Sequence, residues 1–371
     1  MSMAATTSAD LGFPTHPDAY GATWEPRSHH PGVLNLKSCE LRHPAADRLV
    51  AEASRGLTVE AVRSYPVQQE LVAALAEREG LDPASVLVTA GSDTAVSLLI
   101  DAFGVPAGRL VLPEPTYEAW RHYARLRGLP VMSCQHLVRS PWRIDTGALR
   151  TALRTAPPSL VAVTNPASPS GLTLSTEDVA ALAVLADQHG HLLVVDECYG
   201  AFADINHVPL LARFPRLVVL RSYSKAFAVA GSRIAALYAR PPVVDYLSRF
   251  RPDSTVSGCA VQLLLRLVTR EAEFAAIWRD VRGIRQRFVT AVQHAHPTWR
   301  SLDPGANFAT FDTGIPGLPA RLADAVYRRG YRIRSLDALH GLEGCVRIAL
   351  ADASTMDRVA DLLAQVADDD R

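Results

Sequence analysis

The sequence predicts an α/β fold: a three-layer large domain with a mostly parallel sheet, joined to a smaller α+β domain. Short runs rich in Val, Leu and Ile recur between about residues 86 and 239, and stretches of helical character separate them. Continuous apolar runs are typical of parallel strands that helices cover on both faces. After about residue 245 long helices accompany a few strands, which predicts the second domain.

The elements of the large domain follow from these runs. Helices are expected at Thr94–Phe103, Tyr117–Arg127 and Thr176–Gln188, and Ser175 and Asp178 mark the start of the last one as a capping box. The six expected strands are Val86–Gly91, Arg109–Pro115, Leu160–Pro166, Leu192–Tyr199, Leu217–Ser224 and Ile234–Ala239.

The smaller domain has its own pattern. A long helix is expected from Val261 to about His294, strands at Asn307–Phe311 and Val346–Leu350, and a closing helix from about Met356 to Ala367. We therefore assign residues 60–245 to the large domain, and residues 33–59 and 246–371 to the smaller one. Residues 1–32 are rich in Pro, His, Gly and Ser without periodicity, which predicts a flexible N-terminal arm.

Composition argues against several classes of partner. The 371 residues carry 38 basic and 38 acidic side chains, so no overall field would hold nucleic acid or an acidic membrane surface. Five scattered cysteines without metal-ligand spacing predict reduced thiols and no metal site. Apolar runs are far shorter than the roughly 18 residues of a membrane span, and no signal peptide is recognised, so we expect a cytoplasmic protein.

Polar residues end five of the expected strands. Because ligands bind outside the carboxyl ends of strands in an open parallel sheet, these residues are expected on one rim. Each has a plainer interpretation, with Ser92 as an ordinary helix N-cap, Asn165 as a turn residue, Asp196 as a solvated acid and Lys225 as a surface lysine. The five groups are Gly91-Ser92-Asp93, Thr116-Tyr117, Asn165-Pro166, Asp196 to Tyr199, and Arg221 to Lys225.

Some of these residues suit a phosphate group. A helix that starts at Gly91 and Ser92 offers backbone N–H groups and the positive end of its dipole to an anion. Ser222 and Ser224 would add hydroxyl donors, and Arg233 a guanidinium that binds phosphate oxygens with two donors at once. Together they predict a phosphate cup.

Other residues suit an aromatic ring. Tyr117 offers a flat face, and Asp196, at the end of a buried strand, is placed to pair with a protonated pyridine nitrogen. Asn165 and Tyr199 could hydrogen-bond a phenolic oxygen on the same ring. The rim as a whole therefore predicts a phosphorylated aromatic cofactor.

Lys225 stands among small and apolar residues of the stretch RSYSKAFAVAGSRIA (Arg221–Ala235). A lysine amine is a nucleophile only when it is neutral, and burial lowers the pKa of such a group. We expect partial burial, together with the charges of Arg221 and Arg233, to lower the pKa of Lys225. The amine could then form a Schiff base.

Four segments of the chain resemble the fold-type I pyridoxal-phosphate aminotransferases, and among them the histidinol-phosphate aminotransferase group. RSYSKAFAVAGSRIA resembles that group's R-[ST]-x-SKAF-x-[LM]-AG-x-R, and NPASPSG (Asn165–Gly171) resembles NPNNPTG. VVDECYGAF (Val194–Phe202) is similar to DEAY-x-x-F, and TAGSDTAVSLLIDAF (Thr89–Phe103) to G-[SA]-DE-x-x-x-LL-x-x-AF. The resemblance covers roughly Leu34 to Val366.

The resemblance implies a role for each cofactor residue. Lys225 would form the Schiff base with pyridoxal 5′-phosphate, Asp196 would pair with the pyridine nitrogen, and Tyr117 would stack on the ring. Asn165 and Tyr199 would contact the ring's 3′-oxygen. The implied phosphate cup consists of Gly91, Ser92, Asp93, Ser222, Ser224 and Arg233.

The resemblance also implies substrate residues and a homodimer with shared active sites. Arg347 would grip the substrate α-carboxylate, Arg334 matches an arginine that helps bind a substrate phosphate, and Asn307 lies near the carboxylate or simply starts a strand. Tyr65, in Arg63-Ser-Tyr65-Pro66, matches a tyrosine that reaches the phosphate of the neighbouring subunit's cofactor.

One element departs from the family pattern. The segment from Leu36 to Pro44 lacks the glycine and prolines of the usual N-E-N-P-[YF]-G-P-P, so the substrate can differ from histidinol phosphate. We predict a pyridoxal-phosphate enzyme that transfers an amino group between an amino acid and a 2-oxo acid or related carbonyl compound. The alternatives are a decarboxylase of a phosphorylated amino acid and a non-catalytic cofactor-binding module.

Overall fold

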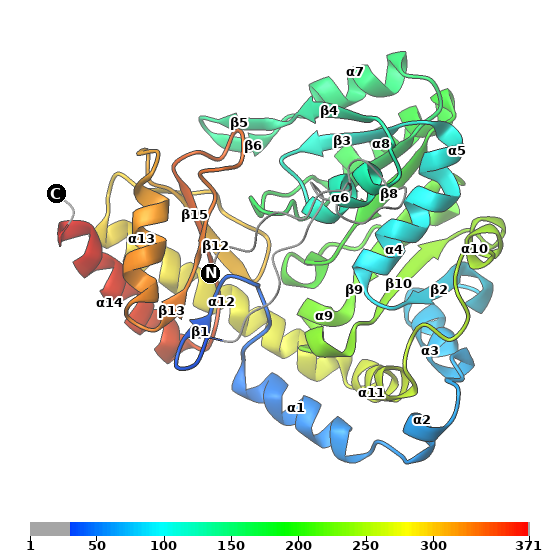
Figure 1. The fold of residues 1–371 in the computed structure, drawn as a ribbon, viewed down its shortest axis with the longest axis horizontal. Coiled ribbons are helices and arrows are strands. Elements are labelled where there is room, and N and C mark those ends of the chain that lie inside the picture. The colour runs from blue at the N-terminus through cyan, green and yellow to red at the C-terminus, as the bar shows by residue number, and fades with distance from the viewer. Residues whose placement is uncertain (1–29, 370–371) are drawn as a thin grey trace, which may run out of the picture.

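A seven-stranded sheet forms the centre of the molecule in the computed structural model, which describes residues 30–369 (Figure 1). Most of the N-terminal arm expected for residues 1–32 lies outside the described residues. The strand order is β2-β10-β9-β8-β7-β3-β4. The strands are β2 (Val86–Thr89), β3 (Leu110–Glu114), β4 (Val131–Gln135), β7 (Leu160–Thr164), β8 (Leu192–Asp196), β9 (Leu217–Ser222) and β10 (Ala235–Ala239).

The sheet is mostly parallel, as predicted. Neighbouring strands from β9 through β8, β7 and β3 to β4 all pair in parallel. Only β10 runs antiparallel, and it does so to both of its neighbours, β2 and β9. The carboxyl ends of the parallel strands therefore lie along one rim, where the predicted site residues follow them.

Helices cover both faces of this sheet, which makes the three predicted layers. On one face, buried apolar residues of α4 (Ser92–Leu99), α6 (Glu118–Leu126) and α10 (Pro241–Ser248) form one core. On the other face, α7 (Gly147–Thr155) and α8 (Thr176–His189) contribute to a second, larger core. Ser175 caps α8 as predicted, since its hydroxyl accepts a hydrogen bond from the Asp178 N–H at 3.1 Å.

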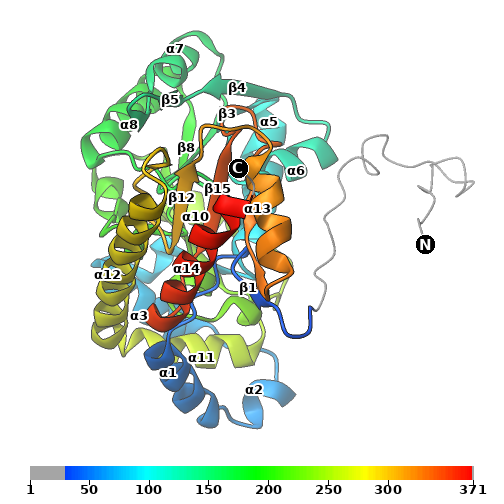
Figure 2. The ribbon, with the colours of Figure 1, turned by 90° about the vertical axis from the view of Figure 1, so that its left-hand side faces the viewer.

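A second sheet lies beside the first, with the strand order β11-β12-β15-β14. Figure 2 shows α12, α13 and α14 side by side along this part of the molecule. The strands are β11 (Arg300–Ser301), β12 (Phe308–Asp312), β14 (Arg334–Ser335) and β15 (Cys345–Ala349), and the helices are α12 (Glu271–Ala295), α13 (Leu318–Tyr327) and α14 (Ala353–Asp369). The division at residues 60 and 245 remains a prediction.

The N-terminal part of the described chain packs against both sheets and their helices. A short strand, β1 (Leu34–Asn35), pairs in parallel with β13 (Tyr331–Arg332). The helices that follow are α1 (Pro44–Arg55), α2 (Glu60–Arg63) and α3 (Gln69–Glu79). Side chains of α1 and α3 enter the larger core.

Two expectations about elements are wrong. The single helix expected from Val261 to about His294 is two helices, α11 (Gly258–Val268) and α12, with a break at Thr269 and Arg270. The helix expected at Thr94–Phe103 is α helical only to Leu99, after which a π-helical turn spans Ile100–Gly104. Among residues 30–369, no helix is both long and apolar enough to cross a membrane.

Candidate active site

Lys225 lies at the rim, in a single helical turn, α9 (Tyr223–Ala226), directly after β9. Its Nζ donates a hydrogen bond to the Ser38 carbonyl at 2.6 Å. Burial lowers the pKa of Lys225, against the opposing effect of Cys39 and Glu40. The predicted burial and the predicted direction of the pKa shift are therefore confirmed.

The expected cause of that shift is partly wrong, because neither Arg221 nor Arg233 is among the main groups that shift the pKa of Lys225, and Arg233 pairs with Asp93. The guanidinium of Arg221 pairs with Glu197 at 2.9 Å and with Glu79, inside the protein. Arg347 is instead the cation that lowers the pKa of Lys225. Arg221 is the next-to-last residue of β9, whereas Lys225 lies in the helical turn α9, so the two side chains leave the chain from different elements.

Gly91 and Arg233 form a close contact at the start of α4. Gly91 is the N-cap of this helix, with φ 82°, so the alternative that Ser92 is the N-cap is wrong. A Cβ at position 91 would lie 2.7 Å from Nη2 of Arg233. The same Nη2 donates to Oδ2 of Asp93 at 2.9 Å. Only glycine leaves room for this guanidinium over the helix start.

Two serines complete this part of the rim. The Ser222 hydroxyl caps α9 by accepting a hydrogen bond from the Ser224 N–H at 3.3 Å. The hydroxyl of Ser224 is buried and has no hydrogen-bond partner. Tyr117, the N-cap residue of α6, donates its hydroxyl to Oδ1 of Asp93 at 2.7 Å, and burial together with this carboxylate raises the pKa of Tyr117.

Asp196 is buried at the end of β8, in the middle of the rim. Its Oδ1 accepts a hydrogen bond from the Cys198 N–H at 3.2 Å, whereas Oδ2 is buried without a partner. The indole N–H of Trp120 lies near this carboxylate, but it makes no hydrogen bond of ordinary geometry. Burial raises the pKa of Asp196 to about 6. An unpartnered carboxylate oxygen of this kind attracts a cation.

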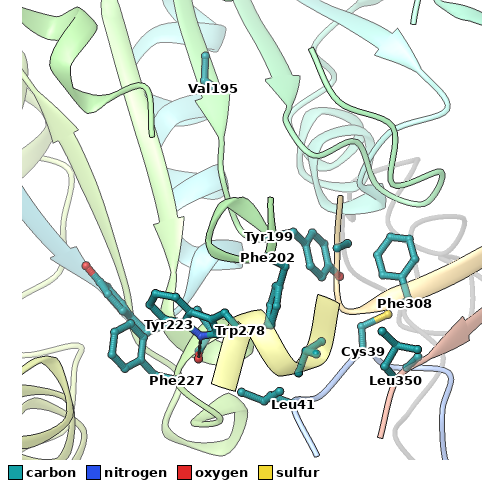
Figure 3. Close-up of a cluster of buried hydrophobic side chains, with 14 of the residues drawn as sticks. Cys39, Leu41, Val195, Tyr199, Phe202, Tyr223, Phe227, Trp278, Phe308 and Leu350 are labelled. Carbon is teal, nitrogen blue, oxygen red and sulfur yellow. Dashed lines mark hydrogen bonds between the residues drawn. The ribbon is translucent and has the colours of Figure 1, made fainter. Parts of the chain in front are cut away.

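Asn165 follows β7, the strand that pairs with β8, and Tyr199 follows β8 itself three residues after Asp196. The amide of Asn165 is held by the backbone of Leu174, since Nδ2 donates to its carbonyl at 3.1 Å and Oδ1 accepts from its N–H at 2.9 Å. One N–H of Nδ2 is left over. Tyr199 is buried edge-on against Phe308, with ring centroids 5.3 Å apart and Cys39 close by (Figure 3). Burial raises the pKa of Tyr199.

The second sheet contributes Arg347 and Asn307, both buried. Nη2 of Arg347 donates to the Lys37 carbonyl at 2.9 Å, and the guanidinium lies over the ring of Phe308, 5.1 Å from its centroid. Nδ2 of Asn307 donates to the Cys39 carbonyl at 2.9 Å. Nε of Arg347 and Oδ1 of Asn307 remain buried without partners.

The segment from Lys37 to Cys39 lines the site, a role that sequence reasoning did not assign to it. Three successive carbonyls of this segment accept hydrogen bonds from Arg347, Lys225 and Asn307. The sequence holds a further signal. Lys37 and Lys225 are the only lysines of the chain, and the Lys37 carbonyl and the Lys225 amine both lie in this site.

Two of the predicted residues lie away from this cluster. Arg334 stands further out on β14 and pairs with Glu118. Tyr65 is 88% exposed, and its neighbours Val62 and Val67 are also exposed. The structure thus brings together every predicted cofactor residue except Tyr65, which is the one that was expected to act on a neighbouring subunit.

The cluster fits a phosphorylated pyridine aldehyde. The orphaned Oδ2 of Asp196 suits a protonated ring nitrogen, and the orphaned hydroxyl of Ser224, beside a helix start and Arg233, suits a phosphate. Lys225 suits an aldehyde, because a buried amine loses its proton more readily. The fold and this lysine site define the class of fold-type I pyridoxal-phosphate enzymes.

Comparison with known proteins gives the family. The family model "Aminotransferase class I and II" matches residues 31–363. The histidinol-phosphate aminotransferase of Rhodospirillum centenum is 31% identical over 348 residues, which are 90% of this chain and 92% of that protein. The histidinol-phosphate aminotransferase of Deinococcus radiodurans is 30% identical over 330 residues, 86% of this chain and 84% of that protein. The chain therefore belongs to the class I and II aminotransferases and is a pyridoxal-phosphate-dependent enzyme.

A solved structure supports the same fold. The histidinol-phosphate aminotransferase of Sinorhizobium meliloti, in complex with pyridoxal-5′-phosphate, superposes with a TM-score of 0.78 over 90% of each chain, at 22% identity. The family match and the relatives named as aminotransferases favour an enzyme over the non-catalytic alternative.

Proposed function

We propose that this aminotransferase moves an amino group from an amino acid to a 2-oxo acid or related carbonyl compound, with Lys225 linking to the cofactor and moving the proton. One observation carries the proposal. A partly buried lysine amine of lowered pKa and a buried carboxylate oxygen without a partner lie on the same rim of the sheet. The first suits an aldehyde and the second suits a ring cation.

Four residues would hold the ring. When bound, pyridoxal phosphate supplies a ring that accepts the electron pair released at the substrate α-carbon. Asp196 would keep a proton on the ring nitrogen, which increases the ring's capacity to accept that pair. Tyr117 would pack against the ring face. Asn165, through its spare N–H, and Tyr199 would donate hydrogen bonds to the ring oxygen.

The phosphate would be held at the start of α4. Backbone N–H groups at a helix start and the positive end of its dipole favour an anion. Arg233 is already turned toward this point by Asp93, and the free hydroxyl of Ser224 would add a donor. The residues proposed for this cup are Gly91, Ser92, Asp93, Ser222, Ser224 and Arg233.

Arg347 would hold the α-carboxylate of the substrate. Its Nε is a buried donor without a partner, and guanidinium donors match a carboxylate in geometry. Asn307, whose Nδ2 already holds the Cys39 carbonyl, would fix the floor of this subsite. Lys225 would then take the α-proton as a base and return it as an acid, a role for which a lowered pKa is suited.

A second copy of the chain would complete the site. Val59, Val62, Tyr65 and Val67 are each 70% exposed or more, and apolar side chains gathered in this way mark an interaction surface. We propose a homodimer in which Tyr65 reaches the phosphate cup of the other subunit. The reaction would take place in the cytoplasm, with small-molecule substrates and without nucleic acid.

A half-reaction tests the proposal. Cofactor-loaded protein is mixed with single amino acids, and we expect the absorbance of the bound aldehyde to be replaced by that of pyridoxamine phosphate. Lys225→Ala should slow this conversion at least a thousandfold, roughly the loss of covalent and acid–base assistance together. The control Arg249→Gln removes an exposed cation at the end of α10, paired with Asp245, and should convert within a few fold of the unaltered protein. Unchanged turnover of Lys225→Ala, or release of carbon dioxide in place of amino transfer, would contradict the proposal.

A further inference from the structure

An ion pair stands at the outer edge of the site, between Arg334 and Glu118. Nη2 of Arg334 donates to Oε1 of Glu118, although the two residues are 216 positions apart in the chain. Arg334 is three-quarters buried, with 25% of its side chain exposed, whereas Glu118 is 51% exposed. The pair connects the large sheet's helix α6 with strand β14 of the second sheet.

Strand geometry directs Arg334 toward the same site as Arg347. The two residues are direct partners across the antiparallel pair of β14 and β15. Side chains of direct cross-strand partners project from the same face of a sheet, about 5 Å apart at Cβ. Ile333, the preceding residue, is buried in the core, as alternation along a strand requires. Arg334 thus lies one strand further out than the proposed carboxylate subsite.

The position of Glu118 is set by its neighbour Tyr117, which lies in the proposed cofactor site. It is the first residue of α6 and directly follows Tyr117, which is anchored to Asp93 by a hydrogen bond of 2.7 Å. A carboxylate in the first turn of a helix is stabilised by the helix dipole. The negative charge at position 118 is therefore held beside the residue proposed to pack on the cofactor ring.

Two charges of opposite sign therefore meet the far end of the substrate. The proposed cofactor cup offsets the carboxylate of Asp93 beside Arg233 with a helix start and the hydroxyl of Ser224. Without such added donors, a carboxylate that matches a guanidinium weakens the attraction of that guanidinium for a phosphate ester. Here the guanidinium of Arg334 is matched by Glu118, and a phosphate brought to it would also face that carboxylate at close range.

We propose that Glu118 is a specificity-determining residue: by pairing with Arg334, it makes the enzyme prefer amino substrates whose far end is uncharged or cationic over their phosphate esters. This inference rests on the proposed function, and it names the substrate class for the same site. A hydroxyl, amide, imidazole or ammonium donor can bind the second oxygen of the Glu118 carboxylate without breaking the ion pair.

Matched substrates test the proposal. Histidinol and histidinol phosphate differ only by the phosphate, so the ratio of their kcat/KM values measures the preference directly. The unaltered protein should favour histidinol. Glu118→Gln, which keeps the shape and removes the charge, should raise kcat/KM for the phosphate ester at least tenfold and lower that for histidinol, because histidinol loses a charged acceptor. Adding Arg334→Gln to Glu118→Gln should abolish the gain.

A control variant and a binding measurement accompany the kinetics. Glu273→Gln removes a carboxylate that is 52% exposed and likewise paired with an arginine, Arg270, but lies on α12 away from the site. It should leave both kcat/KM values unchanged. Calorimetry of inorganic phosphate with cofactor-loaded protein should give at least tenfold tighter binding to Glu118→Gln than to the unaltered protein.

The outcomes separate this inference from the proposed function. If the unaltered protein converts both amines but favours the phosphate ester, or if Glu118→Gln changes both substrates equally, Glu118 does not set specificity while the amino transfer stands. If no amino compound converts the bound cofactor, the proposed function itself is wrong. Equal phosphate binding by the unaltered protein and Glu118→Gln would also overturn the inference.

Discussion

Two residues at the rim, Asp196 and Ser224, have buried polar atoms without hydrogen-bond partners. Asp196 has one carboxylate oxygen without a partner, and Ser224 has a free buried hydroxyl. Leaving such groups unpaired lowers the stability of a protein, so they are retained where a ligand supplies the missing partner. The sequence identified both residues, because each follows an apolar strand that could be recognised by its composition.

The variant Asp196→Asn should separate the effect of this carboxylate on the free energy of unfolding from its effect on cofactor binding. The pKa of Asp196 is raised from 3.8 to about 6, and one unit corresponds to about 1.4 kcal/mol. Between pH 4 and pH 6 the unfolded chain loses this proton while the folded, cofactor-free protein keeps it, so stability falls as the pH rises. The free energy of unfolding of cofactor-free protein should thus drop by about 2 kcal/mol relative to Asp196→Asn over this interval.

Chemical denaturation at several pH values measures this difference. The same variant should bind pyridoxal phosphate at least tenfold more weakly at pH 7.5, because the cation on the ring loses its counter-charge. Asp101→Asn, which removes a surface carboxylate paired with Arg127, is the control and should change neither quantity appreciably. Parallel pH profiles for Asp196→Asn and the unaltered protein would refute the assigned burial effect.

At the scale of elements, a strand or helix could be predicted where neighbouring residues along the chain show its pattern. The apolar strands of the large sheet were found because Val, Leu and Ile runs are visible along the chain. Strand β4, VMSCQ, was missed because an edge strand alternates polar residues and lacks a continuous run. The break between α11 and α12 carries neither Gly nor Pro, so only the packing of the two helices reveals it.

The same holds for the site, where some residues are recognised from their own segment and others only from contacts with distant segments. The proposed cofactor residues follow strand ends and were predictable, whereas the contacts of Lys37 to Cys39 and of Glu118 depend on partners far along the chain. Arg347, for example, is 310 positions from the carbonyl of Lys37 that it binds. No periodicity or spacing encodes such a contact.

The start of α4 offers an experiment on one element. Gly91 and Gly108 both have positive φ, at 82° and 70°. Gly108 is left-handed helical, where alanine should destabilise the fold by about 1–2 kcal/mol. Gly91, with ψ 171°, lies in a region almost restricted to glycine, where alanine should cost about 1–3 kcal/mol. Only at position 91 would the new Cβ meet a neighbour, the guanidinium of Arg233 at 2.7 Å, while nothing lies within 4 Å at position 108. Gly91→Ala should therefore also weaken pyridoxal-phosphate binding at least tenfold, and Gly108→Ala should not.

Thermal unfolding and cofactor titration of both variants provide the check. Equal cofactor affinity in Gly91→Ala and Gly108→Ala would show that the approach of Arg233 to the helix start does not matter for phosphate binding.

At the scale of the whole molecule, the exposed apolar segment around α2 points to a partner. Val62 is 76% exposed, so Val62→Asp should fold normally but disfavour burial of this surface against a second copy. In sedimentation velocity we expect the unaltered protein at twice the mass of the chain and Val62→Asp mainly as a monomer. Cofactor should dissociate faster from the monomer, because Tyr65 of the second copy would be missing.

Ile315→Asp is the matched control, because Ile315 is also an exposed apolar side chain, at 53%, but lies near the second sheet. This variant should remain dimeric. A monomeric unaltered protein with full cofactor affinity, or dissociation of Ile315→Asp to the same extent, would contradict the proposed interface.

The most direct test of the central claim is reduction of the cofactor-loaded protein with borohydride, followed by mapping of the labelled peptide. The chain contains only two lysine side chains, at positions 37 and 225, so the result is a choice between two sites. We predict one stable phosphopyridoxyl adduct per chain, on Lys225. An adduct on Lys37, or none at all in protein that has bound the cofactor, would contradict the account.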